Sequence, residues 1–103
     1  MTLALGPFDP AAYLDTPEAV AEYLVAAFES GEQAVIADAL GVVAKARGMT
    51  QLSRDTGLAR PALYRALSPD GRPEFATVLK VLHALGVRLT PEAASNRLPG
   101  AAT

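Results

Sequence analysis

The stretch from Met49 to Leu67 constrains the fold more than any other part of the chain. Thr50 is placed to cap a short helix, and Gly57 stands where that helix would stop in a left-handed conformation. Pro61 is placed to open a second helix after a brief turn. Four leucines are spaced so that two short helices crossing at a steep angle share one buried seam: Leu52, Leu58, Leu63 and Leu67. The stretch therefore predicts a helix-turn-helix.

The second helix of this motif carries two arginines that face away from the seam. In DNA-binding helix-turn-helix proteins, the first residues of the second helix reach base edges in the major groove. Arg60 stands there and can donate two hydrogen bonds to a guanine, and Arg65 lies five residues further on. The motif therefore predicts a DNA-reading surface. The alternatives are a purely structural helix-glycine-helix corner and a module that binds only proteins.

We expect DNA contacts at outward positions of both helices and of the loop beyond them. The expected contacts are Thr50, Gln51, Arg54, Ala59, Arg60, Pro61, Ala62, Tyr64, Arg65 and Arg72. Within this set, Arg60, Tyr64 and Arg65 are expected to read bases, whereas Arg54 and Arg72 would hold phosphates. Arg72 equally fits a solvated loop residue, because residues 68–73 are dense in turn formers.

The charges divide the chain into an acidic and a basic part, although the net charge is only −2. Residues 1–44 contain seven carboxylates and no lysine or arginine, whereas residues 45–72 contain six basic residues against two acidic ones. A basic patch centred on the helix-turn-helix is the footprint that DNA phosphates require. The acidic part indicates a different, basic partner, or a solvated surface that keeps the protein soluble.

Two helices are predicted before the motif. The first spans residues 17–30, since Thr16 can cap it and Gly31 can end it, and the second spans residues 32–47. Gly41 in the second helix marks either a close helix crossing or a tolerated weak position, which costs about 1 kcal/mol relative to alanine. Each helix has one apolar stripe: Val20, Tyr23, Leu24, Ala27 and Phe28 in the first, and Ile36, Leu40, Val43 and Ala44 in the second.

The remainder of the chain completes one all-α domain. A last helix is predicted over about residues 75–85, from the apolar residues Phe75, Val78, Leu79, Leu82 and Leu85. Residues 87–89 alternate like a strand but are too few to define one. We expect an N-terminal arm at 1–15, a helical domain at 16–90 and a flexible C-terminal tail at 91–103. Phe8, Tyr13 and Leu14 would hold the arm against the domain or a partner.

Nothing in the sequence supports catalysis or a cofactor. The chain has no cysteine, and its single histidine, His83, cannot build a zinc site alone. No Ser-His-Asp or Cys-His set and no glycine-rich phosphate loop is present. No apolar run approaches the ~20 residues of a membrane span, and residues 1–10 lack the features of a signal peptide. We therefore expect a cytoplasmic protein that is not an enzyme and binds no metal.

Five segments carry a family resemblance. They are FDPAAYLDTPEAVAEYL (8–24), AKARGMTQLSR (44–54), GLAR (57–60), LYRALS (63–68) and TVLKVL (77–82). Together they resemble the addiction-module antidote proteins, which are HigA-type antitoxins encoded beside RelE-like toxins. The resemblance covers about residues 8–90, and its most specific part is the YLDTPE run at 13–18. It departs at Pro61, where family members usually carry a polar residue, so the family's operator contact there does not transfer.

This resemblance implies a fold, a mechanism and two partners. The fold is a five-helix, lambda-repressor-like domain, which would form a homodimer, bind the operator of its own operon and neutralise a small basic RelE/HigB-like toxin. A two-fold dimer would place its two recognition helices about 34 Å apart on a palindrome. The acidic residues Glu18, Glu22 and Glu29 are then expected to face the toxin. The alternative function is a stand-alone helix-turn-helix repressor without a toxin partner.

Overall fold

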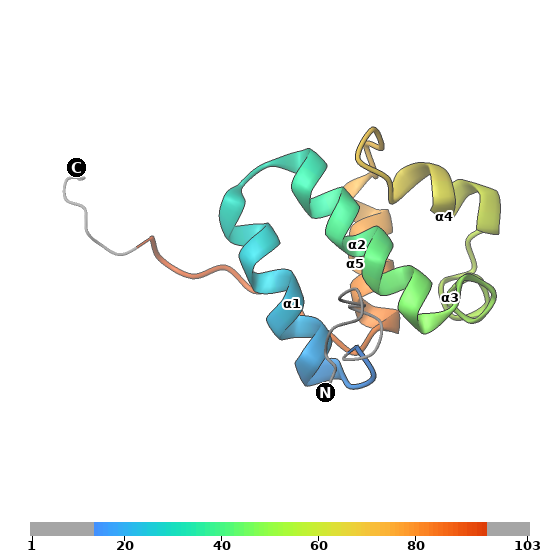
Figure 1. Ribbon diagram of the computed structural model, residues 1–103, viewed down its shortest axis with the longest axis horizontal. Coiled ribbons are helices and arrows are strands. Elements are labelled where there is room, and N and C mark those ends of the chain that lie inside the picture. Colours follow the sequence, from blue (N-terminus) through green and yellow to red (C-terminus); the bar gives the residue numbers. More distant parts are fainter. Residues whose placement is uncertain (1–13, 95–103) are drawn as a thin grey trace, which may run out of the picture.

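The protein folds as five helices, which the computed structural model describes within residues 14–94 (Figure 1). The helices are α1 (Pro17–Ser30), α2 (Gln33–Arg47), α3 (Met49–Thr56), α4 (Arg60–Ala66) and α5 (Phe75–Ala84). In Figure 1, α2 crosses the middle of the molecule, with α1 on one side of it and the α3–α4 pair on the other. No strand is found within residues 14–94, so the alternating residues 87–89 form none, and the predicted all-α class is confirmed.

Helix α1 has the predicted bounds because local signals define both of its ends. The Thr16 hydroxyl accepts a hydrogen bond of 3.1 Å from the Ala19 backbone N–H, and Pro17 occupies the first helical position. The helix ends at Gly31, whose N–H donates to the Phe28 carbonyl. Of its predicted stripe, Val20, Leu24 and Ala27 are buried, whereas Tyr23 and Phe28 are half-buried against the core.

Helix α2 is the central element of the core, and Gly41 is the residue that brings α4 close to it. Leu40, Val43 and Ala44 are at most 1% exposed, and Ile36 is half-buried. A Cβ atom at Gly41 would collide with the backbone carbonyl oxygen of Leu67, just beyond α4. Gly41 was predicted to mark either a close helix crossing or a tolerated weak position, and the structure supports the close crossing.

The apolar stripe predicted for α5 is wrong at two positions. Phe75 is 67% exposed and Leu79 is 41% exposed, whereas Val81, absent from the predicted stripe, is fully buried beside Leu82 and Leu85. Apolar residues surround most of this helix, so several stripes of helical spacing fit its sequence equally well. Only the helices packed against α5 decide which stripe turns inward.

The two ends of the described chain differ in burial. Leu14 is 8% exposed and packs into the core cluster. The rest of the apolar set expected in the arm, Phe8 and Tyr13, lies outside the described residues. Residues 91–94 are exposed and belong to no helix, and the remainder of the predicted tail also lies outside the described range.

The contact at Gly41 predicts the effect of adding one methyl group. Gly41→Ala would gain about 1 kcal/mol from helix propensity but would push α2 from the Leu67 carbonyl, and such overpacking costs about 1–3 kcal/mol. We expect a net destabilisation, measured as a lower urea midpoint by circular dichroism. Asp38→Ala, at an exposed position of the same helix, is the propensity control and should stabilise slightly. Equal stabilisation by both changes would contradict the close contact.

Candidate nucleic-acid interface

The turn between α3 and α4 is held by side chains as well as by the backbone. The Ser53 hydroxyl donates to the Leu58 carbonyl at 2.6 Å, and the Thr56 hydroxyl donates to the Leu52 carbonyl at 2.8 Å. The same Thr56 oxygen accepts from the Leu58 N–H at 3.2 Å. Gly57 adopts the predicted left-handed conformation, with φ of 77°, and its N–H donates to the Ser53 carbonyl. These bonds define how α4 leaves α3.

The caps of the two helices differ from those expected. Helix α3 begins at Met49 and is preceded by Gly48, so Thr50 lies inside the first turn and its predicted capping role is wrong. The chain passes from α2 into α3 through Gly48 alone, and the Leu52 N–H bonds to the Gly48 carbonyl. Pro61 is the second rather than the first residue of α4, still within the turn that needs no internal N–H partner.

Helix α4 presents one polar side and one buried side. Leu63 is fully buried, as is Leu52 of α3, so the predicted seam between the two helices forms. On the outside, Arg60, Pro61 and Tyr64 line a shallow surface hollow, and Tyr64 is 45% exposed. Arg60 and Tyr64 are one helical turn apart, so a guanidinium and a phenol stand side by side on this surface.

The loop after α4 brings Arg72 to the same hollow as Arg65. This hollow has a volume of about 600 Å³ and lies between α4 and the start of α5. Half-buried Ala62 also lines it, as do the carboxylates Asp70 and Glu74. Arg65 and Arg72 are both exposed and thus open to an incoming phosphate. The two carboxylates reduce the positive charge of the hollow, so its field is weaker than the arginines alone would give.

Helix α3 carries a polar network that sequence reasoning missed in part. The Gln51 amide donates to the Asp55 carboxylate at 2.9 Å, and Arg54 donates to the Gln51 amide oxygen at 3.4 Å. Asp55 also lies 3.9 Å from Arg47, which donates to the Ala84 carbonyl at 3.1 Å. Arg47 lies in the last turn of α2. The spacing of Gln51 and Asp55 signals their pairing, but no sequence feature signals the bond to Ala84.

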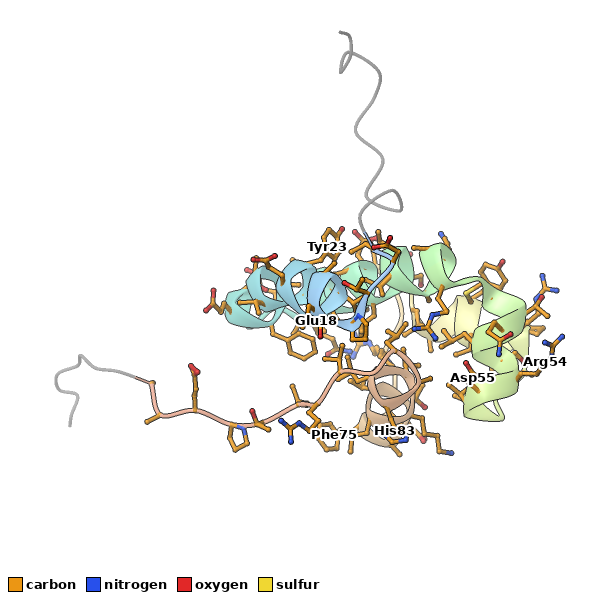
Figure 2. All side chains as sticks on the ribbon, turned by 90° about the horizontal axis from the view of Figure 1, so that it is seen from below. Glu18, Tyr23, Arg54, Asp55, Phe75 and His83 are labelled. Carbon is orange, nitrogen blue, oxygen red and sulfur yellow. The ribbon has the colours of Figure 1, made fainter. Side chains whose placement is uncertain are left out.

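The polar residues of α3 lie on two sides of the helix. Figure 2 shows Arg54 at the outer edge of α3 and Asp55 on the side facing α5. Thr50, Gln51 and Arg54 are exposed, and so is Ala59 at the start of α4. Nine of the ten expected contact residues are therefore accessible, and Ala62 alone is half-buried.

The acidic residues expected to face a toxin lie elsewhere in the fold. Glu18, Glu22 and Glu29 are all exposed and all belong to α1, which packs on α2. In Figure 1, α2 lies between α1 and the α3–α4 pair. The structure therefore separates the acidic set from the basic one and places the two on different helices.

Residues 14–94 also bear on membrane insertion and on metal binding. None of the helices there is both long enough and apolar enough to cross a bilayer. In the same range, histidine and the carboxylates form no group of three that could hold a metal ion, and His83 is exposed.

Comparison with known proteins covers all five helices. Residues 4–93 match a protein family described as "Probable addiction module antidote protein". A relative from Haemophilus influenzae (strain ATCC 51907 / DSM 11121 / KW20 / Rd), named "Uncharacterized protein", is 43% identical over 88 residues. The aligned part makes up 85% of this chain and 91% of the relative. No solved structure matches the chain.

The left-handed turn predicts a specific sensitivity at one glycine. Gly57→Ala places a Cβ atom in open space, so its cost, about 1–2 kcal/mol, comes from the positive φ alone. Gly57→Asn should cost less, because asparagine tolerates this conformation better. Urea unfolding of the two variants measures the difference. If alanine left the free energy of unfolding unchanged, the turn could not have this conformation.

Proposed function

The chain belongs to the family of addiction-module antidote proteins, and from that premise we propose that it represses its own operon and neutralises a RelE/HigB-like toxin. Membership of an antidote family implies a toxin partner and a regulatory rather than an enzymatic role. The observation that supports operator binding is the exposed arginine surface of α4, carried on a turn that side chains hold in place. Such a surface would need little rearrangement when DNA binds, which would lower the entropic cost of binding.

We assign the base contacts to α4 and the phosphate contacts to its surroundings. Arg60 and Tyr64 share one exposed hollow and would read base edges together with Arg65. Arg72 approaches the DNA backbone from the loop beyond α4, and Arg54 from α3. Phosphate contacts of this kind fix the register of the helix in the groove and carry no sequence information themselves.

Smaller side chains complete the proposed interface. Thr50 and Gln51 are exposed beside Arg54 on α3, where they would meet the DNA backbone. Ala59 and Pro61 are exposed at the start of α4, where an apolar surface suits a thymine methyl group. Half-buried Ala62 would allow the backbone of α4 to approach the duplex closely.

The outer face of α5 is the proposed homodimer interface. Phe75 and Leu79 are one turn apart on this helix, and they expose 67% and 41% of their surface. Figure 2 shows Phe75 on the side of α5 turned away from α1 and α2. In a lambda-repressor-like dimer, two such faces would meet across the two-fold axis. The same axis would place one copy of α4 on each half-site of the operator. Burying this apolar pair would remove the largest exposed side chain of α5 from water.

Operator binding can be tested with duplex DNA from upstream of the chain's own gene. Arg60→Ala and Arg65→Ala should each weaken binding by about 1–3 kcal/mol, or about 5- to 150-fold, and should relax base preference. Arg72→Ala should weaken all duplexes alike and lower the salt slope by about one. Mobility shifts across a salt series measure both quantities, with scrambled duplex as the reference.

The matched control is Arg88→Ala, which removes an exposed arginine beside α1, away from α4. It should leave operator affinity unchanged. Wild-type affinity in the α4 variants would show that the recognition face is misassigned, and the absence of any salt-dependent shift would remove operator binding. If DNA binds but the product of the adjacent gene does not, the chain is a stand-alone repressor.

The dimer interface makes a separate prediction. The double variant Phe75→Ser and Leu79→Ser should sediment as a monomer at micromolar concentration, because the apolar contact that holds the two copies together is removed. Its affinity for a single half-site should be retained, while affinity for the full palindrome falls. Val35→Ser, at a 42% exposed valine on α2, is the control and should remain dimeric. A dimeric double variant would place the interface elsewhere.

A further inference from the structure

An apolar groove runs between α1 and the segment that follows α5. Its volume is about 370 Å³, and its apolar floor comes from Leu24, Val25 and Phe28 of α1 together with Leu82, Val87 and Leu89. A second hollow continues it toward the start of α1, lined by Pro17, Glu18 and Gly86, and shares Ala21, Val87, Arg88 and Thr90 with the first. The groove therefore follows α1 over most of its length.

Two side chains of this floor are exposed to solvent, one from α1 and one from the segment after α5. Val25 is 51% exposed and Leu89 is 40% exposed, so both large side chains remain in water in the isolated chain. The groove has the volume of a small-molecule site, but such sites enclose most of their ligand. An open apolar channel beside a helix fits a protein segment better.

The rim of the groove is acidic. Glu18, Glu29 and Glu92 line it, against Arg88 as the single basic side chain among its lining residues. Figure 2 shows Glu18 on the side of α1 that faces the chain beyond α5. The surrounding sequence strengthens this field, since residues 14–44 contain six carboxylates and no lysine or arginine. An occupant must therefore bring apolar side chains for the floor and positive charge for the rim.

We propose that this groove is the docking site for a basic, apolar-anchored segment of the toxin, an inference that rests on the antitoxin function proposed above. The apolar floor supplies affinity by burying Val25 and Leu89, and the acidic rim orients the segment and speeds its association. A second copy of the chain is disfavoured as occupant, because two acidic rims would repel each other. Nucleic acid is disfavoured for the same reason.

Calorimetric titration of the full chain with the toxin encoded beside it tests the floor of the groove. Val25→Ser should weaken the complex about tenfold or more, since it removes an apolar contact at the centre of the interface. Val35→Ser is the matched control, an exposed valine on α2 outside the groove, and should change affinity less than about twofold. Both variants should bind operator DNA like the wild type, which shows that they are folded.

A second pair of variants tests whether the toxin is attracted by the rim of the groove or by the overall negative charge of the chain. Of the three carboxylates expected to face the toxin, the groove proposal keeps Glu18 and Glu29, which line the groove, and leaves out Glu22, which does not. Glu29→Gln therefore removes a rim carboxylate, whereas Glu22→Gln removes an exposed carboxylate of the same helix outside the groove. We expect slower association only for Glu29→Gln, with the difference largest at low salt. Equal effects would mean that overall charge, not the groove, attracts the toxin, and would overturn the assignment.

The outcomes distinguish a failure of the groove assignment from a failure of the antitoxin function. If the wild-type chain binds the toxin and Val25→Ser binds it equally well, the groove is wrong while the antitoxin function stands. If the wild-type chain does not bind the toxin, the antitoxin function fails and the groove assignment fails with it. If Val25→Ser instead changes the sedimentation of the chain alone, the groove is an interface between copies, which also overturns the proposal.

Discussion

The position of α4 depends on the close contact between Gly41 of α2 and the carbonyl oxygen of Leu67. This contact fixes the far end of α4, while the bonds of Ser53 and Thr56 fix its near end at the turn. A helix of seven residues is too short to be stable by itself, so its geometry comes from these two attachments and from the burial of Leu63. The candidate DNA-binding surface is thus positioned by residues that do not belong to it.

Arg47 connects this surface to the rest of the domain. Its guanidinium reaches both the Ala84 carbonyl at the end of α5 and the Asp55 carboxylate of α3. The side chain is 34% exposed, so the ion pair with Asp55 is partly screened and contributes little by itself. The bond to a terminal helix carbonyl matters more, because that oxygen has no partner within the helix. The same residue therefore satisfies the end of α5 and lies within ion-pair distance of α3.

The sequence predicted those features that depend on neighbours in the chain. The Thr16 cap, the left-handed Gly57 and the bounds of α1 follow from residues within one helical turn, and all three are confirmed. The predicted Thr50 cap is wrong because α3 begins at Met49, directly after Gly48, so Thr50 lies inside the first turn. Three other features depend on residues that are distant in sequence, and a helical pattern carries no information about them. They are the exposure of Phe75, the contact of Gly41 with Leu67 and the groove beside Val25.

Helix α5 connects the three proposed surfaces. The loop with Arg72 leads into its first turn, Phe75 and Leu79 lie on its outer face, and Leu82 forms part of the groove floor. In Figure 1, α2 lies between α4 and α1, which lines the groove, so a segment in the groove would not cover the candidate DNA-binding face. Coupling between toxin and operator would then act through the angle at which two α5 helices meet, since that angle sets the spacing of the recognition helices. By linkage, DNA would change toxin affinity by the same factor as toxin changes DNA affinity. An occupant that holds α5 at the spacing of the proposed operator would strengthen repression, and one that tilts it would release the DNA.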